Sequence, residues 1–478
     1  MSSRADDEII FCPPDKKMAS IMPSLPPRSD QCSIPNRADV RVPLPPHQAV
    51  VIAGGTILPI ADFLRRKDLP RLPSAGESCS CSAGERLSVA SHRLALFVTA
   101  PVIELPGNKV VLDKKFVRGI EAHLEYWNGP LRCFLRRGAR EIPFGQAFKS
   151  DALGFDLSLL EPNHRVTDTC LANFDVALLS GDSTADLLSP TSIALSRCRL
   201  AYGIEYTHQT RQRINQLESI GSMRKAVRAL RIAMTEMRRR SAFRHAAGLQ
   251  CNGYPAHEVY GSLNARSMLY LDSRALPEMM ATEKEMYARE RWLLSGKSLR
   301  LVHSGRLEPT KGAHQLVPIA HRLKKAGLNF TFDIYGAGSL AGLISDAIRA
   351  HHLSDAVRLH PSVDYVRELV PTMRRSYDLF VSAHLQSDPS CTYLESLACG
   401  VPVVGHCNQM WRSLSEASGG GFAVSPATPA AMAEMILDLN SRRWAVVEAA
   451  RRGLAFAKRH NFASQFRLRM EHLADLAR

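Results

Sequence analysis

A single carboxylate in an apolar setting is the first group in this sequence that could do chemistry. Residues 387–405 read SDPSCTYLESLACGVPVVG, and Glu395 stands there among leucines, alanines and cysteines. A buried carboxylate without a partner is costly, so Glu395 needs either a neighbouring side chain or a bound polar ligand. The residues around it do not decide between these two partners.

Cap and turn residues predict the helix that must position Glu395. Asp388 suits the N-cap and Pro389 the first helical position, while Gly400 suits a left-handed exit. We therefore expect a helix from about Pro389 to Cys399. On a turn of 3.6 residues, the carboxylate would ride on the apolar face. The residues that share this face are Cys391, Leu394 and Ala398.

Two cations follow an apolar run earlier in the second half of the chain. The segment LRLVHSGRLEPTKGAHQL predicts a strand, then a loop holding Arg306 and Lys311, then a helix. Backbone N–H groups and the dipole at a helix start would add to these charges, so the loop suits a phosphate. The alternative is that both residues are solvated loop cations. A second strand-to-helix turn, FDIYGAGSL, places Gly336 and Gly338 where a backbone could approach a ligand closely or simply turn.

Composition and charge restrict the class of protein. A chain of 478 residues with 45% hydrophobic content can bury substantial cores, and a net charge of +15 indicates attraction to anions. The N-terminus shows no secretory signal pattern, and the apolar run at 49–64 is too short and too broken for a membrane span. The eleven cysteines show no repeated metal-ligand spacing, which favours free thiols in a reducing cytosol.

The composition and the hydrophobic periodicity of the sequence change near residue 90. The first 90 residues are rich in Pro, Ser, Cys and Arg without periodicity, which predicts a disordered extension. Afterwards short apolar runs alternate with amphipathic stretches, as expected for parallel sheets wrapped by helices. The runs are LALFVTAPV, PLRCFLRR, FDLSLLE, FDVALLS and RLAYGIEY, and after SMLYLDS and the charged helix EKEMYARERWLL the pattern restarts with LRLVHSG, FTFDIYG, AVRLHP, DLFVSA and VPVVG.

The order of these segments carries a resemblance to a known family. SGRLEPTKG, YGAGSL, VRLHPSV, DLFVSA and YLESLACGVPVVG follow one another as in the nucleotide-sugar-binding domain of retaining GT-B glycosyltransferases of family 4, the glycosyl transferases group 1. The resemblance is firm over 298–440 and looser over 91–297. It implies an α/β GT-B fold, with two Rossmann-like domains facing each other across a cleft. The expected domains are a Pro-rich extension (1–90), an acceptor domain (91–280) and a donor domain (281–478) whose final helices could cross back.

The resemblance also implies roles for single residues. Arg306 and Lys311 match the pair that holds the donor diphosphate and stabilises the departing charge, in agreement with the anion loop. Glu395 matches the second glutamate of the motif E-x7-E, which binds the nucleotide ribose, so its partner would be the ligand. The glycines of the donor-binding loops would be Gly305, Gly336 and Gly338.

The first glutamate of that motif is missing. Its position holds Ser387, and the neighbouring Asp388 could reach the donor sugar or serve as the N-cap. In the first half, the family places a residue near the reacting carbon at a strand end. Here Glu205 and His208 are the candidates; the alternatives are an ion pair between Glu205 and Arg211 or Arg213, and a surface histidine.

A basic amphipathic helix is predicted over 223–240. One apolar stripe runs along it, flanked by lysine and arginine, so the helix could lie on anionic lipid. The alternative is a core-packing helix with a solvated basic face. Aromatic residues for stacking on bases are almost absent, which argues against nucleic acid. The residues of the stripe are Met223, Val227, Leu230, Met234 and Met237.

The resemblance and the residues together imply a cytoplasmic hexosyltransferase, acting at the inner face of the membrane or free of it. It would move a hexose from a nucleoside diphosphate sugar to a sugar or lipid-linked acceptor, with retained anomeric configuration and in polysaccharide or glycolipid biosynthesis. No metal site, no cofactor besides the donor and no nucleic-acid partner are expected. A non-catalytic sugar-nucleotide-binding or scaffold protein of the same fold is the alternative, favoured by the missing first glutamate.

Overall fold

The computed structural model describes residues 50–53, 56–59, 91–139, 141–142, 145–218 and 220–478. The first described segments form a two-stranded antiparallel ladder, β1 (Val50–Ala53) with β2 (Thr56–Pro59). The prediction of a disordered extension over 1–90 otherwise falls outside the described residues. Residues 82–478 group into one compact unit, which contains all the other described helices and strands.

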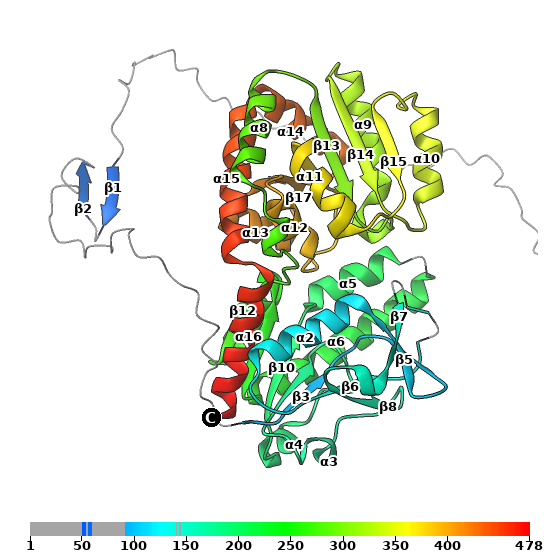
Figure 1. The fold of residues 1–478 in the computed structure, drawn as a ribbon, viewed down its shortest axis with the longest axis vertical. Helices are drawn as coiled ribbons and strands as arrows, with labels where there is room; N and C mark the ends of the chain where they lie inside the picture. Colours follow the sequence, from blue (N-terminus) through cyan, green and yellow to red (C-terminus); the bar gives the residue numbers. More distant parts are fainter. Residues whose placement is uncertain (1–49, 54–55, 60–90, 140, 143–144, 219) are drawn as a thin grey trace, which may run out of the picture. The chain divides into compact units, whose positions relative to one another are not determined.

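The first half of this unit is built on a seven-stranded parallel sheet (Figure 1). Parallel strands are covered on both faces, which explains their near-continuous apolar sequences. The spatial order is β12-β11-β10-β9-β3-β6-β8. The strands are β3 (Leu94–Phe97), β6 (Leu131–Arg136), β8 (Asp156–Leu160), β9 (Val176–Ser180), β10 (Arg199–Ile204), β11 (Gly248–Asn252) and β12 (Ser267–Tyr270). A small antiparallel sheet, in the order β4-β5-β7, joins β4 (Val102–Leu105), β5 (Lys109–Asp113) and β7 (Gly145–Lys149).

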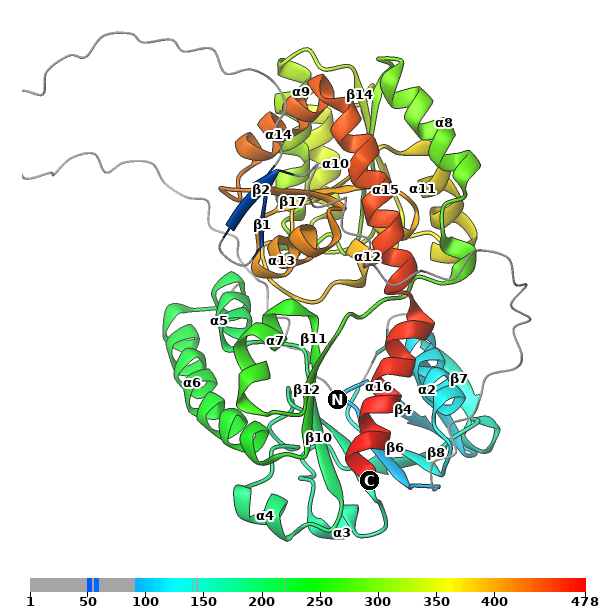
Figure 2. The same cartoon turned by 90° about the vertical axis from the view of Figure 1, so that its left-hand side faces the viewer.

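Helices cover both faces of the first sheet. One face packs against α2 and the C-terminal α16, the other against α4, α6 and α7. The helices of this half are α2 (Lys114–Tyr126), α3 (Asp168–Leu171), α4 (Pro190–Leu195), α5 (His208–Leu217), α6 (Ser222–His245), α7 (Gly253–Tyr260) and α16 (Phe462–Ala477). Because α16 contacts α2 and β12, the last helix of the chain is part of the first half (Figure 2).

The second half repeats the architecture with six parallel strands in the order β15-β14-β13-β16-β17-β18. One core lies under α9, α10 and α14, and the other under α11, α12, α13 and α15. The strands are β13 (Leu299–Ser304), β14 (Phe330–Tyr335), β15 (Val357–His360), β16 (Leu379–Ser382), β17 (Val403–His406) and β18 (Gly421–Val424). The helices are α8 (Glu283–Leu294), α9 (Leu316–Lys325), α10 (Ala341–Ala350), α11 (Val370–Ser376), α12 (Cys391–Ala398), α13 (Gln409–Ser418), α14 (Pro429–Ser441) and α15 (Arg443–Arg459).

The predicted α/β architecture with two parallel-sheet, Rossmann-like halves is confirmed. Each apolar run named from the sequence contains a strand, and the charged stretch EKEMYARERWLL is α8. Two parallel strands, β11 and β18, were not anticipated. Their sequences, GLQCN and GFAV, are short and contain glycine or polar residues, which weakens the signal for a buried strand.

The two halves touch through side chains near the carboxyl ends of their strands. Glu258 of α7 accepts hydrogen bonds from Gln409 Nε2 at 2.8 Å and from Ser413 Oγ at 2.7 Å, both on α13. Gly253 adopts a φ of +80°, and an added Cβ would lie 2.9 Å from the sulfur of Met410. In addition, α5, which follows β10, contacts the turn Pro309–Lys311, which follows β13, so the loops after these two strands lie at the same junction.

Candidate active site

The loop after β13 holds Lys311 against the end of β16. Gly312 adopts a φ of +66°, and an added Cβ would lie 1.9 Å from the Ala383 carbonyl oxygen, so this contact requires glycine. Lys311 is 7% exposed. Its Nζ lies 2.5 Å from Oδ2 of Asp388, an ion pair that joins the two sequence-predicted loops. The predicted anion loop thus contains one buried cation, already paired with one carboxylate.

Asp388 pairs with Lys311 instead of capping the next helix. The prediction of an N-cap at Asp388 is wrong, because α12 begins at Cys391 and its N-cap is Ser390, whose side chain makes no capping hydrogen bond. Oδ1 of Asp388 is buried and accepts no hydrogen bond from the described part of the chain. A buried ammonium nearby attracts the carboxylate more strongly than backbone N–H groups do. Asp388 therefore keeps one acceptor oxygen available for a polar ligand.

Glu395 is buried in α12 and is 7% exposed. The sequence predicted one apolar and one polar face for this helix, but every residue over 393–400 is buried, because α12 packs between the second sheet and α15. Burial in the first place, and the nearby Glu395 carboxylate in the second, raise the pKa of Tyr365. Glu395 and Tyr365 are therefore neighbours at the edge of this core.

Two glycines fit the loop after β14 onto the loop after β13. A Cβ added at Gly336 would lie 2.0 Å from the Gly305 carbonyl oxygen, and one added at Gly338 would lie 2.5 Å from the Leu307 carbonyl oxygen. Both residues adopt positive φ angles, +151° and +156°. The absence of Cβ atoms is thus explained by the contact between the loops. The predicted contact of these glycines with a donor stays a prediction.

The carboxylate of Glu308 joins the loop after β13 to the loop after β14, close to Arg306 in the sequence. Glu308 accepts hydrogen bonds from Ser339 Oγ at 2.6 Å and from Ser339 N at 2.9 Å. These bonds, with a smaller contribution from the Arg306 charge, lower the pKa of Glu308. Arg306 itself is exposed. Its guanidinium can therefore bind a ligand that arrives from solvent, and no buried partner loses a contact when it does so.

The first half contributes Glu205 and His208. Glu205 directly follows β10, and His208 begins α5, which contacts the turn Pro309–Lys311 of the second half. Burial raises the pKa of Glu205 to about 7, with smaller contributions from nearby carboxylates that include Asp388. Glu205 therefore lies within electrostatic reach of the Lys311–Asp388 pair. Residues from both halves, predicted separately from the sequence, meet at one junction.

The neighbours of Glu205 and His208 differ from those expected. Arg211 pairs with Asp182 and donates to the carbonyl oxygen of Tyr206. Within the described residues, the expected ion pair of Glu205 with Arg211 or Arg213 is not formed. His208 is partly buried, and its Nδ1 has no hydrogen-bond partner among the described residues. Its imidazole is therefore neither a surface group nor fully engaged.

Asp182, which sequence reasoning missed, holds the loop that carries Glu205. Its Oδ2 accepts from the backbone N of Glu205 at 3.0 Å, and its Oδ1 accepts from that of Tyr206 at 3.2 Å. Asp182 follows β9 in LLSGDS, so a carboxylate just past a buried strand was the available signal. Asp182 orients Glu205 and also raises its pKa.

His384 was missed as well. It lies just beyond β16 and is 2% exposed. Burial, and then the charge of Lys311, lower the pKa of His384 well below its usual value, so the imidazole is neutral. Its Nδ1 lies 3.4 Å from Oη of Tyr393. A neutral ring beside the cation loop can exchange hydrogen bonds with a ligand without adding charge.

The raised pKa of Glu205 leads to a prediction about stability. Below pH 4.5 the carboxyl is protonated in both states; between pH 4.5 and 7 only the unfolded state ionises, so the protein loses stability as pH rises. We expect Glu205→Gln to raise the free energy of unfolding above pH 7 by roughly 1 to 3 kcal/mol and to change it little near pH 4.5. Thermal unfolding at both pH values measures this. Glu434→Gln, an exposed substitution, is the control, and equal effects of both at high pH would contradict the prediction.

Metal-ligating side chains do not cluster in the described part of the chain: no group of three or more His, Cys, Asp or Glu there could hold a metal ion. No described helix combines the length and hydrophobicity needed to cross a membrane. The described cysteines form no disulfides.

Comparisons with known proteins place this geometry among glycosyltransferase folds. Residues 287–453 match the family model of the glycosyl transferases group 1 and form a domain of that type. No curated protein matches the sequence.

Three solved structures resemble the chain at low sequence identity. Anabaena Alr3699/HepE, solved in complex with UDP and glucose, is 14% identical with a TM-score of 0.53, over 80% of this chain and 98% of its own. WaaG, a glycosyltransferase involved in lipopolysaccharide biosynthesis, is 12% identical with a TM-score of 0.51, over 80% and 99%. Sucrose-phosphate synthase from Thermosynechococcus elongatus is 14% identical with a TM-score of 0.52, over 80% and 98%. Residues 91–478 thus have the GT-B fold.

Proposed function

We propose that this chain is a retaining glycosyltransferase that moves a hexose from a nucleoside diphosphate sugar to an acceptor hydroxyl. The observation that carries the proposal is the junction of the two halves. There the Lys311–Asp388 ion pair of the second half lies within electrostatic reach of Glu205 of the first, and Arg306 is part of the same loop as Lys311. The match of residues 287–453 to the glycosyl transferases group 1 supports it, as does the similar fold of Anabaena Alr3699/HepE, which was solved with UDP and glucose.

In this proposal the second half holds the donor. Arg306 and Lys311 stabilise the charge that develops on the departing diphosphate, and these two side chains take the place of a bound metal. Oδ1 of Asp388 accepts a hydrogen bond from a hydroxyl of the donor sugar. Glu395 accepts hydrogen bonds from the nucleotide ribose. Charge stabilisation of this kind is stronger where water is excluded from the site.

The first half presents the acceptor. Glu205, with a pKa of about 7, can release or hold a proton near neutral pH beside the acceptor hydroxyl. His208 begins α5, three residues after Glu205, and its Nδ1, which has no hydrogen-bond partner in the described part of the chain, orients the same hydroxyl. Retention of configuration is expected if acceptor and leaving group use the same face of the donor sugar.

The experiment that tests the function screens nucleoside diphosphate sugars first for thermal stabilisation and then for transfer. A donor that binds its site raises the unfolding temperature by mass action. Transfer of labelled sugar with an α-configured product from an α-configured donor would support the proposal. Stabilisation without transfer or hydrolysis would instead support the second candidate, a non-catalytic sugar-nucleotide-binding protein.

One observation favours that second candidate. Ser387 occupies the position of the missing first glutamate, and its Oγ accepts a hydrogen bond from the backbone N of Gln409 at 3.0 Å. Ser387 is thus engaged in holding the start of α13. The catalytic candidate therefore depends on Asp388 for its contact with the donor sugar.

The proposal places the enzyme in the cytoplasm at an anionic membrane surface. The apolar stripe on α6 is exposed along its whole length, with Met223 at 82%, Leu230 at 63% and Met237 at 69%. The alternative of a core-packing stripe is therefore wrong. Exposed arginines flank the stripe, and the pairing of an apolar face with cations fits anionic lipid. These arginines are Arg224, Arg228, Arg231 and Arg238.

Removing the stripe should release the protein from lipid. We expect Leu230→Ser, Met234→Ser and Met237→Ser, combined, to weaken binding to anionic vesicles by at least about tenfold, because apolar area no longer leaves water. Higher salt should weaken binding of the parent protein too. Vesicle co-sedimentation measures both effects. Arg239 and Arg240, at the end of the basic face, are less suitable for replacement, because they hydrogen-bond within the protein to Gly181 and Glu236.

The matched control replaces three equally exposed apolar residues of the second half, Leu294, Leu343 and Trp444, by serine. Its co-sedimentation should equal that of the parent. If the stripe variant also binds vesicles like the parent, the membrane proposal is wrong. A loss of dimer in sedimentation equilibrium, with unchanged vesicle binding, would identify a second copy of this chain as the occupant of the stripe.

A further inference from the structure

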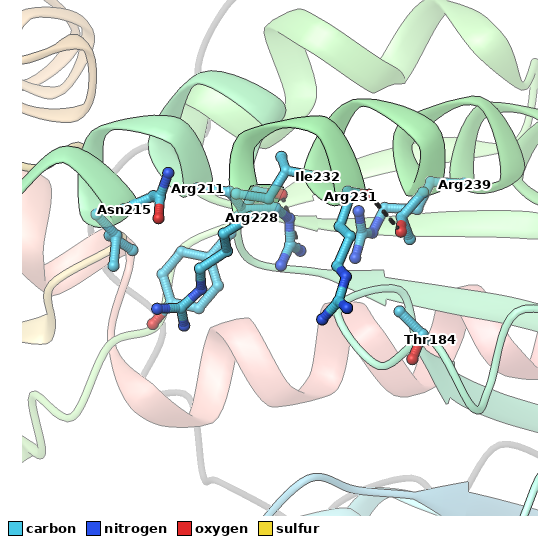
Figure 3. A pocket seen from close by; sticks show the side chains of 10 residues that line it. Thr184, Arg211, Asn215, Arg228, Arg231, Ile232 and Arg239 are labelled. Carbon is cyan, nitrogen blue, oxygen red and sulfur yellow. Dashed lines mark hydrogen bonds between the residues drawn. The ribbon is translucent and has the colours of Figure 1, made fainter. Parts of the chain in front are cut away.

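A pocket lined by arginine lies beside the candidate active site. It has a volume of about 330 Å³ and is formed by α5, α6 and the loop after β9. Figure 3 shows Arg231 extending from α6 toward the loop that carries Thr184, while Arg228 extends from the same helix on the side of Asn215. The charged residues of the lining are Arg211, Arg228, Arg231 and Arg239.

The pocket has more cations than carboxylates to balance them. Arg211 pairs with Asp182, and Arg228 pairs with Glu218. Arg231 makes no hydrogen bond or ion pair through its side chain within the described ranges. Arg239 likewise has no carboxylate in contact. Asp182 and Glu236 act on Arg239 only from beyond contact distance, so the lining carries more positive charge than its directly paired carboxylates balance.

Arg239 shows that the excess of positive charge in the pocket lining includes a buried side chain. It is 3% exposed, and its Nε donates to the Gly181 carbonyl oxygen at 3.0 Å. Its Nη1 is buried and has no hydrogen-bond partner in the part of the chain that is described. Nε of Arg211 is in the same situation. Buried donors on charged groups are costly to leave unpaired, so this lining is suited to an anion with several acceptor oxygens.

We infer that this pocket binds a phosphate group carried by the acceptor. A phosphate supplies one negative charge as a diester and about two as a monoester, together with several acceptor oxygens, and guanidinium groups bind it in a bidentate manner. The inference rests on the proposed function, because it names the class of acceptor that the same site would take.

Two neighbouring features indicate that the phosphate belongs to the acceptor and that the acceptor is a lipid. Tyr206 lines the pocket and follows Glu205 directly, so a bound phosphate lies next to the proposed reacting end of the acceptor. On the other side, Arg228 and Arg231 also line a second hollow of about 430 Å³, together with Met223 and Val227 of the apolar stripe. An acceptor with a phosphate between its sugar and its lipid would extend from Glu205, at the end of β10, to the apolar stripe of α6.

Titration of inorganic pyrophosphate into the full chain tests the pocket. All variants carry Arg306→Ala, which removes the proposed donor site as a competing place for pyrophosphate. In this background we expect Arg231→Gln to weaken pyrophosphate binding about tenfold and Arg231→Lys to restore part of it. Arg238→Gln, the same charge change on an exposed arginine of α6 outside the pocket, should leave the affinity unchanged.

Equal affinities of the Arg231→Gln and Arg238→Gln proteins would overturn the inference. This readout does not involve sugar transfer, so a failure of the proposed function, seen as no transfer from any donor, is a separate result. Vesicles of phosphatidylcholine containing phosphatidic acid distinguish the source of the phosphate. Weaker vesicle binding of Arg231→Gln than of Arg238→Gln supports a lipid phosphate, while equal vesicle binding with an altered pyrophosphate affinity overturns the lipid part of the inference and leaves a soluble phosphorylated acceptor.

Discussion

Turnover of the Arg306→Ala protein is expected to fall by at least about a hundredfold, because a preorganised cation at the leaving diphosphate acts mainly in the transition state. Arg306 is exposed, and no carboxylate is left buried without it, so the fold should persist. Steady-state transfer from the donor found in the screen measures the effect. Lys325→Ala removes an exposed cation at the far end of α9 and serves as the control.

Lys311→Ala tests the same role with a second, structural effect. Its removal leaves Asp388 buried without its cation, so we expect lower thermal stability as well as lower turnover. The double replacement Lys311→Met with Asp388→Asn removes both charges and should recover stability without recovering turnover. Near-normal turnover of both the Arg306 and Lys311 variants would show that these cations do not hold the diphosphate.

Nucleotide affinity is expected to fall by roughly 1.5 to 3 kcal/mol in the Glu395→Gln protein, because an ionised acceptor forms stronger hydrogen bonds with ribose hydroxyls than an amide does. The substitution keeps the shape of a side chain that is 7% exposed. Isothermal titration with the nucleoside diphosphate of the preferred donor measures the loss.

The control for Glu395 is Glu434→Gln, on an exposed position of α14. Thermal unfolding without nucleotide separates a binding role from a structural one. A Glu395→Gln protein that unfolds earlier but binds nucleotide with unchanged affinity would mean that the carboxylate serves its neighbours in the core of the second half, and the predicted ribose contact would be wrong.

The two sheets and the loops at the ends of their strands were predictable from the order of residues alone. Buried parallel strands need apolar residues on both faces, so runs such as those at 299–304 and 379–382 are visible without any tertiary information. The loop with Lys311 and the strand end with Glu205 were predictable because each places a charged residue shortly after an apolar run. The resemblance in the order of these segments predicted the GT-B fold.

Local rules failed where distant residues compete for the same group. Asp388 has the sequence signature of an N-cap, yet it pairs with Lys311, which lies 77 residues earlier in the chain. Charge at close range in a buried setting outweighs a backbone capping bond, and no local pattern records which distant cation arrives. The helix α12 accordingly begins at Cys391 and not at the predicted Pro389.

Which faces of the helices are covered depends on the packing of separate elements and could not be predicted from the sequence. An apolar stripe on a basic helix has the same periodicity whether it packs in a core or faces solvent, and the packing of α6 through Ala242 and Phe243 leaves Met223 and Leu230 exposed. The meeting of Glu205 with Asp388, and the unbalanced arginines between α5 and α6, likewise arise from contacts between separate elements. Burial and charge balance are properties of the assembled surfaces, because they depend on distances in space that the spacing of residues along one segment does not set.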